Sequence, residues 1–497
     1  MSFIDSHLLT VVIFSPLFGL VPLLVLRESR WQRWAVLLAS FIPFYYSVKL
    51  FLEFQSAGDL EFIEKIAWIP RFHINYHLGV DGFSLPLILL TTFLTPIVIL
   101  GARSAVQKRT TGFYGLLLIL EVGMLGVFSS IDLFLFYVFW EVVLFPMYFI
   151  IGIWGGSRKV YAAIKFVLYT MAGSLLMLAA ILYLYFAGGK SFSLIDLYSL
   201  SLPPSTQLCL FSAFALAFAI KIPLFPFHTW LPDAHVEAPT PGSVILAGVL
   251  LKMGTYGFVR FAIPLFPQAM TLAAPLFFVL SVVGIIYGAL VSMVQPDLKK
   301  LIAYSSVSHL GFVMLGLTSM TAQGVAGASL QMVNHGLSTG ALFLLVGMLY
   351  ERRHTRQISE FGGLAIPMPI YATFFLVIAF SSMGLPLTNG FIGEFLILIG
   401  TFKSAPIYAA LGALGVVLGA VYLLWMIRRV FFGPITHEEN RNLLDLNLRE
   451  VLLLLPIVLF VFWIGVAPGF LLKRINPTID HFLERTVIFH HAVITND

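Results

Sequence analysis

Among the titratable side chains inside long apolar stretches of this 497-residue sequence, six stand out, namely Glu141, Lys221, Lys252, His309, His335 and Glu394. If these stretches cross a membrane, each charge costs on the order of 3 kcal/mol at the bilayer centre, even on a lenient insertion scale. Side chains that carry such a cost usually face a polar interior or an ion pathway. Carboxyl, amine and imidazole groups all take up and release protons. The set therefore predicts a buried route for protons.

The first two of these residues suggest a pair. Glu141 lies in the apolar segment FWEVVLFPMYF, with no second acid near its middle. An unpaired carboxyl in such a place is neutral, whereas a cation within about 4–6 Å favours its charged form. We expect Lys221 to be that cation, in a contact whose making and breaking would change the proton affinity of the lysine. The alternative is a static ion pair that fixes helix packing.

The other four residues would carry the proton onward. Lys252 lies on the span after that of Lys221, at a similar depth, which suggests a step from one lysine to the other. His309 and His335 can both donate and accept a proton near neutral pH. Glu394 would end the route. The alternatives are that the histidines only pack, and that Glu394 caps backbone amides of a broken helix.

No cofactor or metal site is predicted within the chain. The single cysteine, Cys209, excludes an iron–sulfur cluster or a thiolate zinc site held by this chain alone, and no glycine-rich nucleotide motif is present. His228 and His235, in the segment FHTWLPDAHVEAPTPG, lack the spacing of a metal-binding pair. We expect this segment to form a hydrogen-bonded hairpin that packs the base of a broken helix.

Composition indicates the kind of fold that must position these groups. Hydrophobic residues make up 59% of the chain and charged residues 11%, against roughly 25% charged in soluble proteins. This excludes a water-soluble fold and predicts an all-α polytopic membrane protein. Fourteen apolar spans of membrane-crossing length are expected, at 8–26, 34–52, 82–101, 111–130, 132–152, 162–187, 208–226, 242–264, 272–293, 301–319, 322–350, 368–402, 405–427 and 451–472.

The distribution of basic residues predicts the orientation. Most lysines and arginines follow odd-numbered spans, as do Arg158, Lys299 and Arg352, whereas the loop 53–81 is rich in acids. The positive-inside rule then places both termini outside, on the periplasmic side of a bacterial inner membrane. The net charge of +5 is explained by these clusters, so no nucleic-acid partner is expected.

Two spans contain breaks. In span 7, KIPLFP places two prolines beside Lys221, and in span 12 the segment GLPLTNG precedes Glu394. Proline cannot donate the backbone hydrogen bond of a helix, and broken helices in two halves of a chain are typical of inverted-repeat transporters with an ion path at the breaks. Near these spans, Lys165 is expected to extend toward the membrane surface, and Glu121 and Asp132 are interpreted either as pathway residues or as helix caps.

Five segments identify a resemblance to a known family. They are FWEVVLFPMYF, GIWGG at 152–156, the run KIPLFPFHTWLPDAHVEAPTPGSVILAGVLLKMGTYG at 221–257, DLKKLIAYSSVSHLGF at 297–312 and NGFIGEF at 389–395. Together they resemble the antiporter-like membrane subunits of proton-pumping NADH:quinone oxidoreductase, respiratory complex I. The glutamate at 394, and the segments GLPLTNGFIGEF and YERRHTRQISEFGGLA, resemble the M-type branch of this family.

The resemblance implies two inverted five-helix repeats, spans 4–8 and 9–13. These give units at 1–110, 111–264, 272–430 and 431–497. It also implies that Glu141, Lys221, Lys252 and Glu394 carry the proton. FMN, iron–sulfur clusters and quinone would belong to partner subunits, and the partners would be other membrane subunits, especially neighbouring antiporter-like ones, and the lipid bilayer. The alternatives are a subunit of an Mrp-type cation/proton antiporter, a subunit of a related hydrogenase or photosynthetic complex, and a scaffold whose buried ions only fix packing.

Overall fold

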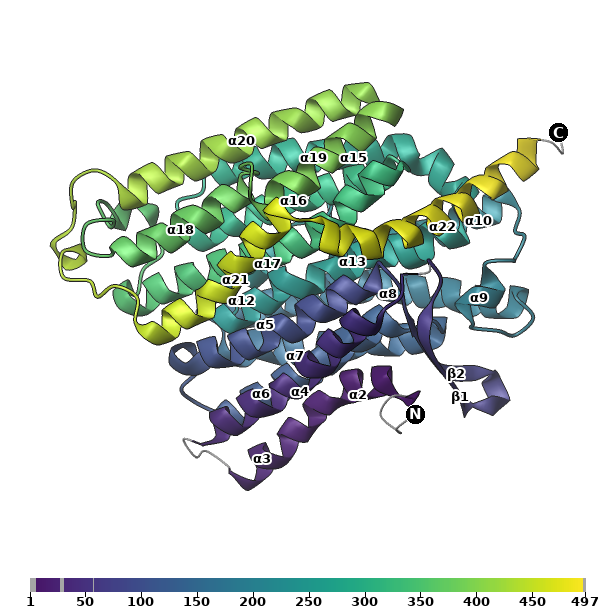
Figure 1. Ribbon diagram of the computed structural model, residues 1–497, viewed down its shortest axis with the longest axis horizontal. Coiled ribbons are helices and arrows are strands. Elements are labelled where there is room, and N and C mark those ends of the chain that lie inside the picture. Colours follow the sequence, from purple (N-terminus) through teal and green to yellow (C-terminus); the bar gives the residue numbers. More distant parts are fainter. Residues whose placement is uncertain (1–5, 27–30, 57, 495–497) are drawn as a thin grey trace.

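The computed structural model describes residues 6–26, 31–56 and 58–494, and it is a bundle of helices that run side by side (Figure 1). The amino-terminal part contains one helix interrupted by a 3-10 turn, a second long helix, a β-hairpin and four further long helices. Their bounds are α2 (Leu8–Phe14), η1 (Ser15–Gly19), α3 (Leu20–Val25), α4 (Gln32–Glu53), β1 (Glu61–Ile69), η2 (Pro70–Phe72), β2 (Ile74–Val80), α5 (Ser84–Ala105), α6 (Thr110–Ser129), α7 (Leu133–Trp154) and α8 (Lys159–Ala187).

The central part contains the first interrupted helix and a helix with two π-helical turns. Its elements are α9 (Leu194–Leu197), α10 (Pro204–Lys221), α11 (Trp230–Glu237), α12 (Thr240–Ile245), η3 (Leu246–Leu250), α13 (Leu251–Gly257), η4 (Phe258–Ala262) and α14 (Ile263–Leu265). The rest of the chain consists of α15 (Pro267–Met293), α16 (Leu298–Thr318), α17 (Ala322–Arg353), η5 (Ile358–Glu360), α18 (Pro369–Ser382), α19 (Asn389–Ser404), α20 (Pro406–Phe431), η6 (Glu438–Asn440), α21 (Leu448–Val466) and α22 (Gly469–Ile494).

The predicted spans are present. Among the described residues, thirteen helices are long and apolar enough to cross a membrane. The remaining predicted span, 368–402, is divided into the shorter helices α18 and α19. The fold is therefore that of an all-α polytopic membrane protein, as composition indicated, with breaks in spans 7 and 12. The inverted repeats and the unit boundaries stay predictions.

Side-chain caps fix where several helices begin. Asp132 accepts hydrogen bonds from the amides of Phe134 and Leu135 at the start of α7, so its role is that of a cap. Asp297 caps α16 in the same way. Asn447 begins α21 with a capping box completed by Glu450. These caps supply hydrogen bonds that the first turn of a helix cannot make for itself.

Two elements differ from the sequence-based expectation. The loop 53–81 contains an antiparallel hairpin, β1–β2, which lies at the end of the bundle that we call the hairpin end (Figure 1). The buried carboxylate of Glu64 on β1 accepts a hydrogen bond from the amide of Leu9 and so holds the hairpin to α2. The hairpin has a mixed polar and apolar sequence that gives no membrane-span signal. Its short strands were missed for that reason.

The predicted carboxyl-terminal boundary of the last span, 451–472, is also wrong. Helix α21 stops at Val466, and α22 starts at Gly469 and passes across the hairpin end. Pro468 lacks an amide hydrogen, which explains the turn between them. On α22 the buried side chains alternate with charged ones such as Lys473 and Arg485, and this amphipathic pattern is too polar for a span.

His77 on β2 gives the hairpin end a predicted pH dependence. Burial of the imidazole, which is 2% exposed, and the ammonium of Lys65 opposite it lower the pKa of His77 to about 4. An unfolded histidine titrates near 6.5, so the unfolded hairpin binds a proton first as the pH falls. The stabilisation is therefore complete above about pH 6.5 and declines between pH 6.5 and about 4.

We expect amide hydrogen exchange in residues 61–80, corrected for intrinsic rates, to speed up between pH 7 and pH 5. In His77→Gln this acceleration should be smaller, because the titrating group is gone. The exposed His73 offers a matched control, since His73→Gln should behave as the parent does. An identical pH response in the parent and His77→Gln would contradict the assignment.

Candidate functional site

Four of the six predicted residues form one connected group between α13, α16, α17 and α19. The Nζ atom of Lys252 lies 2.7 Å from Nδ1 of His335. The ring of His335 lies beside that of His309, with 5.8 Å between centroids, and Nδ1 of His309 is 3.0 Å from Oε1 of Glu394. All four side chains are buried, Lys252 completely. The structure thus brings together the amine, both imidazoles and the carboxyl that the sequence singled out.

The local helix geometry explains how Lys252 reaches this group. The π-helical turn 246–250 comes one turn before Lys252, and the ammonium donates a hydrogen bond to the carbonyl of Ala247, five residues earlier. A π-helical turn displaces backbone carbonyls from the regular helical pattern, and such turns are common at functional sites. Span 8 is therefore not the uniform helix that its apolar sequence suggested.

Glu394 is oriented by side chains and not by the broken helix. Its Oε1 atom accepts a hydrogen bond from Nε2 of Gln331, at 3.1 Å, in addition to its contact with His309. No backbone amide donates to the carboxylate of Glu394 in the described part of the chain, and at the break Nδ2 of Asn334 donates to the carbonyl of Asn389 at 2.7 Å. The alternative that Glu394 caps freed amides is therefore wrong.

Sequence reasoning missed Gln331, Asn334 and Asn389. A signal was available on α17, where Gln331, Asn334, His335 and Ser338 recur at intervals of three and four and so share one face. Their contact with α19 depends on small residues. A Cβ atom on Gly327 would come within 2.6 Å of the amide nitrogen of Ile397, so only glycine permits this approach of the two helices.

Lys221 and Glu141 do not make the direct ion pair that we expected. Lys221 is the last residue of α10, and its ammonium lies over the ring of Trp140 at 5.1 Å and near Phe166 at 5.8 Å. This cation–π contact supplies part of the attraction that a carboxylate would otherwise give. The backbone left open by the break is satisfied by Trp230, whose indole nitrogen donates to the carbonyl of Ile220 at 2.8 Å.

Glu141 faces outward from the bundle. It lines a hollow of about 360 Å³ between α7 and α8, together with apolar side chains that include Phe145, Tyr148 and Leu168. Its Oε1 atom is buried and has no hydrogen-bond partner. No hydrogen bond connects Lys221 with Lys252, although α10 and α13 pack against each other, with Ile222 beside Gly254. Glu141 and Lys221 are thus separate from the connected group of Lys252, His335, His309 and Glu394.

The other titratable residues singled out in the sequence make structural contacts or, like Glu121, have no contact in the described part of the chain that explains them. The ring of His235 stacks on Phe343 with 4.5 Å between centroids, and that of His228 stacks on Phe225. Lys165 is 20% exposed and donates to the carboxylate of Asp233 on α11, at 2.7 Å, so the expected extension toward the surface ends in an ion pair. Glu121 is fully buried in α6, away from either helix end, so it is not a cap.

Comparisons with known proteins show the family of the chain. Residues 130–421 match the family described as NADH:quinone oxidoreductase/Mrp antiporter, transmembrane region. Residues 11–127 match the amino terminus of NADH-ubiquinone oxidoreductase chain 4. The chain belongs to the subunit M, or chain 4, family of NADH:quinone oxidoreductase. It is therefore a membrane subunit of a multi-subunit enzyme, and membrane subunits of that enzyme are its partners.

The relatives span nearly the whole chain. NADH-ubiquinone oxidoreductase chain 4 of Marchantia polymorpha is 45% identical over 480 residues, which cover 96% of this chain and 97% of that protein. NADH-quinone oxidoreductase subunit M of Rickettsia prowazekii is 42% identical over 488 residues, covering 97% and 99%. A chain of respiratory complex I from Thermus thermophilus has a TM-score of 0.89 and 35% identity, covering 96% of this chain and 99% of that one.

The Mrp alternative has weaker support. A chain of the Mrp complex from a Dietzia species has a TM-score of 0.82 and 22% identity, and the match covers 97% of this chain but 52% of the other. This likeness shows a shared fold alone. The amino-terminal match to chain 4 and the higher identity to subunit M favour the oxidoreductase.

Removal of the central imidazole provides a test of the connected group. In His335→Phe the ring volume is kept, but both nitrogens between Lys252 and His309 are lost. We expect most NADH-driven proton pumping by the reconstituted complex to disappear while the complex still assembles. The control is His481→Phe, at an exposed position on α22, which should pump as the parent does. Unimpaired pumping by His335→Phe would show that the contacts at His335 only hold the helices together.

Proposed function

We propose that this chain carries protons across the membrane through Glu141, Lys221, Lys252, His335, His309 and Glu394, coupled to quinone reduction in partner subunits. The observation that carries the proposal is the chain of contacts from Lys252 to Glu394. A structural scaffold needs paired charges, but it does not need four titratable groups in sequence across three helix interfaces.

The contacts suggest how a proton passes along the second half of this route. Two adjacent cations are unfavourable, so a charged Lys252 has a neutral His335 as the acceptor at Nδ1, 2.7 Å away. Transfer makes His335 the cation and leaves the lysine neutral. The Nε2 atoms of His335 and His309 both lack a protein partner, and the step between the two rings uses these atoms. His309 then passes its proton to Glu394 across 3.0 Å.

The first half would control when a proton is loaded. Lys221 rests against aromatic rings, while Glu141 lies in an outward-facing hollow and its Oε1 atom has no hydrogen-bond partner. Movement of the carboxylate toward Lys221 would stabilise the charged amine, and its withdrawal would release the proton toward Lys252. Because the hollow is open to the outside of the chain, we infer that a neighbouring antiporter-like subunit covers it and sets the position of Glu141.

Redox chemistry would take place in other chains. We infer that FMN, iron–sulfur clusters and quinone are held by partner subunits, since a single cysteine supplies too few ligands for a cluster. The basic loops after odd-numbered spans support a cytoplasmic position for the end of the bundle opposite the hairpin. In a bacterial inner membrane both chain termini would then lie on the periplasmic side, with lipid around the bundle.

Lys221 is the residue on which loading depends in this proposal. Lys221→Ala should lose most proton pumping, measured as dye-reported acidification of proteoliposomes, while the chain remains inserted and assembled. Lys403→Ala serves as the matched control, because that lysine is exposed at the end of α19. Normal pumping by the Lys221 variant would exclude the proposed route.

Purification under mild conditions tests the assignment of partners. The tagged chain, extracted in a gentle detergent, should bring with it flavin-containing and iron–sulfur subunits and NADH-dependent quinone reduction. Small membrane proteins alone, without redox activity, would instead indicate a cation/proton antiporter. The readouts are identification of the co-purified chains and the rate of quinone reduction.

A further inference from the structure

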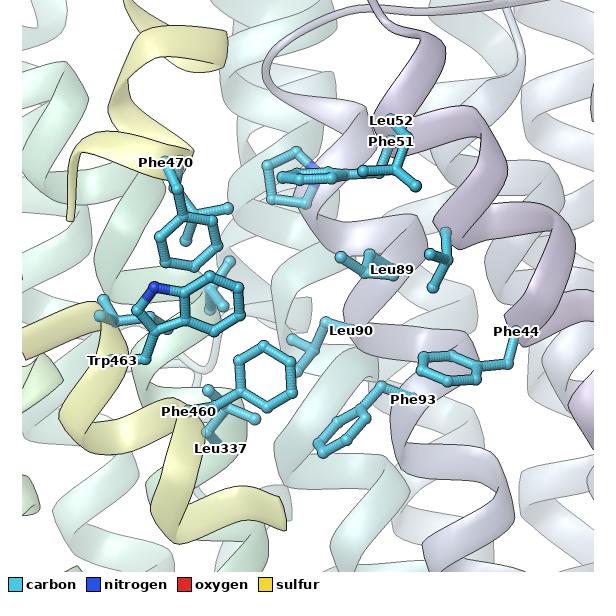
Figure 2. Close-up of a pocket in the computed structure, with 15 residues that line it drawn as sticks. Phe44, Phe51, Leu52, Leu89, Leu90, Phe93, Leu337, Phe460, Trp463 and Phe470 are labelled. Atoms are coloured by element: carbon cyan, nitrogen blue, oxygen red, sulfur yellow. The ribbon is translucent and has the colours of Figure 1, made fainter. Parts of the chain in front are cut away.

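An apolar groove of about 200 Å³ lies outside the proposed proton route, between α4, α5, α17, α21 and α22 (Figure 2). All of its lining side chains are apolar, and the rings of Phe93 and Phe460 pack edge to face there, with 5.0 Å between their centroids. Two lining residues are open to the outside, because Leu52 is 69% exposed and Trp463 is 50% exposed. An apolar cavity of about 150 Å³ stays dry and accepts an apolar guest, so this one suits a hydrocarbon.

The groove has the shape of a slot parallel to the helices. Its wall on α4 extends from Phe44 to Leu52, which corresponds to about 12 Å along the helix axis. The slot therefore extends from the hairpin end of α4 toward the middle of the bundle, the direction in which lipid acyl chains lie in a bilayer. Its volume of about 200 Å³ is too small for a helix of a partner protein, which is about 10 Å wide with its side chains.

Basic side chains stand at the outer mouth of the slot. The guanidinium of Arg474 lies over the ring of Phe51 at 4.1 Å and donates hydrogen bonds to the carbonyls of Phe51 and Phe470. These two residues line the groove, so Arg474 is held at its opening. Lys473 precedes it on α22 and is exposed. Within the described part of the chain, neither Lys473 nor Arg474 pairs with a carboxylate.

We propose that this groove binds one acyl chain of an anionic phospholipid, with its phosphate at Arg474 and Lys473. The apolar slot fits the hydrocarbon, and the two unpaired cations fit the negative headgroup at the level where it would lie. The nearby acid on α4, Glu53, lies 3.8 Å from Lys49, and in the described part of the chain no ion pair joins it to Lys473 or Arg474.

A bound lipid would also support the site. Val333 and Leu337 form the floor of the groove, and they lie on α17, the helix that carries His335. Leu90, another lining residue, packs against Gly336. An acyl chain in the slot would thus cover the back of α17 and keep the helix pressed toward Lys252.

Photolabelling of the purified whole complex tests this inference. The probe is phosphatidylglycerol with a diazirine on one acyl chain, and labelled peptides are located by mass spectrometry. We expect label on residues 44–52 and 460–471. Leu89→Trp fills the slot from α5 and should abolish this label, whereas Leu424→Trp, at an exposed position on α20, should retain it.

The charge is tested separately with Lys473→Gln and Arg474→Gln. Labelling by phosphatidylglycerol should weaken by about fivefold for each cation removed, and the parent should label less with phosphatidylcholine. Equal labelling of Leu89→Trp and Leu424→Trp would overturn the proposed site. Equal labelling by the two lipids would overturn the choice of an anionic headgroup, and a crosslink from the groove to a partner polypeptide would show a protein occupant instead.

Discussion

A bilayer offers no hydrogen bonds, and each interruption of a helix inside it must therefore be satisfied by the protein itself. Both breaks in this chain meet that requirement with hydrogen bonds inside the protein. At the first break the indole of Trp230 donates to the carbonyl of Ile220. At the second break the backbone amides of Gly384 and Leu385 donate to the carbonyls of Ser381 and Phe380 at the end of α18. These bonds allow irregular backbone beside Lys221 and Glu394.

The two breaks nevertheless support different arrangements. At the second break, Glu394 is held by Gln331 and His309, so the carboxyl is connected by hydrogen bonds to the neighbouring helices. At the first, Lys221 contacts aromatic rings, and Glu141 lies in a hollow with its Oε1 atom unbonded. The hydrogen bonds of Glu394 to two other helices restrain its geometry, whereas the Oε1 atom of Glu141 has no such restraint. The movable part of the site is therefore the part that faces outward, where a neighbouring subunit can act on it.

Much of this could be predicted from the sequence, because long apolar runs and clustered arginines follow directly from the cost of burying polar groups in lipid. The spans, both breaks and the six titratable residues were predicted on that basis. The contacts between these titratable residues were predicted less well. Glu141 and Lys221 share a depth, but whether they touch depends on how α7 and α10 rotate, and that rotation is set by the packing of rings such as Trp140. The hairpin and α22 were missed because hydropathy detects membrane spans and not amphipathic elements at the surface.

The contact between Lys252 and His335 shows how little of a site residue's role is encoded at its own position. The lysine side chain reaches His335 from a helix with a π-helical turn at 246–250, whose residues appear in the sequence as an ordinary apolar run. On the opposite helix, Gly336 lies against Gly248, and a Cβ atom on Gly336 would come within 2.7 Å of the Gly248 carbonyl. Two glycines beside the chemical groups therefore set the distance between the helices, and that distance decides whether amine and imidazole can share a proton. The proton route depends on close backbone packing as much as on its titratable side chains.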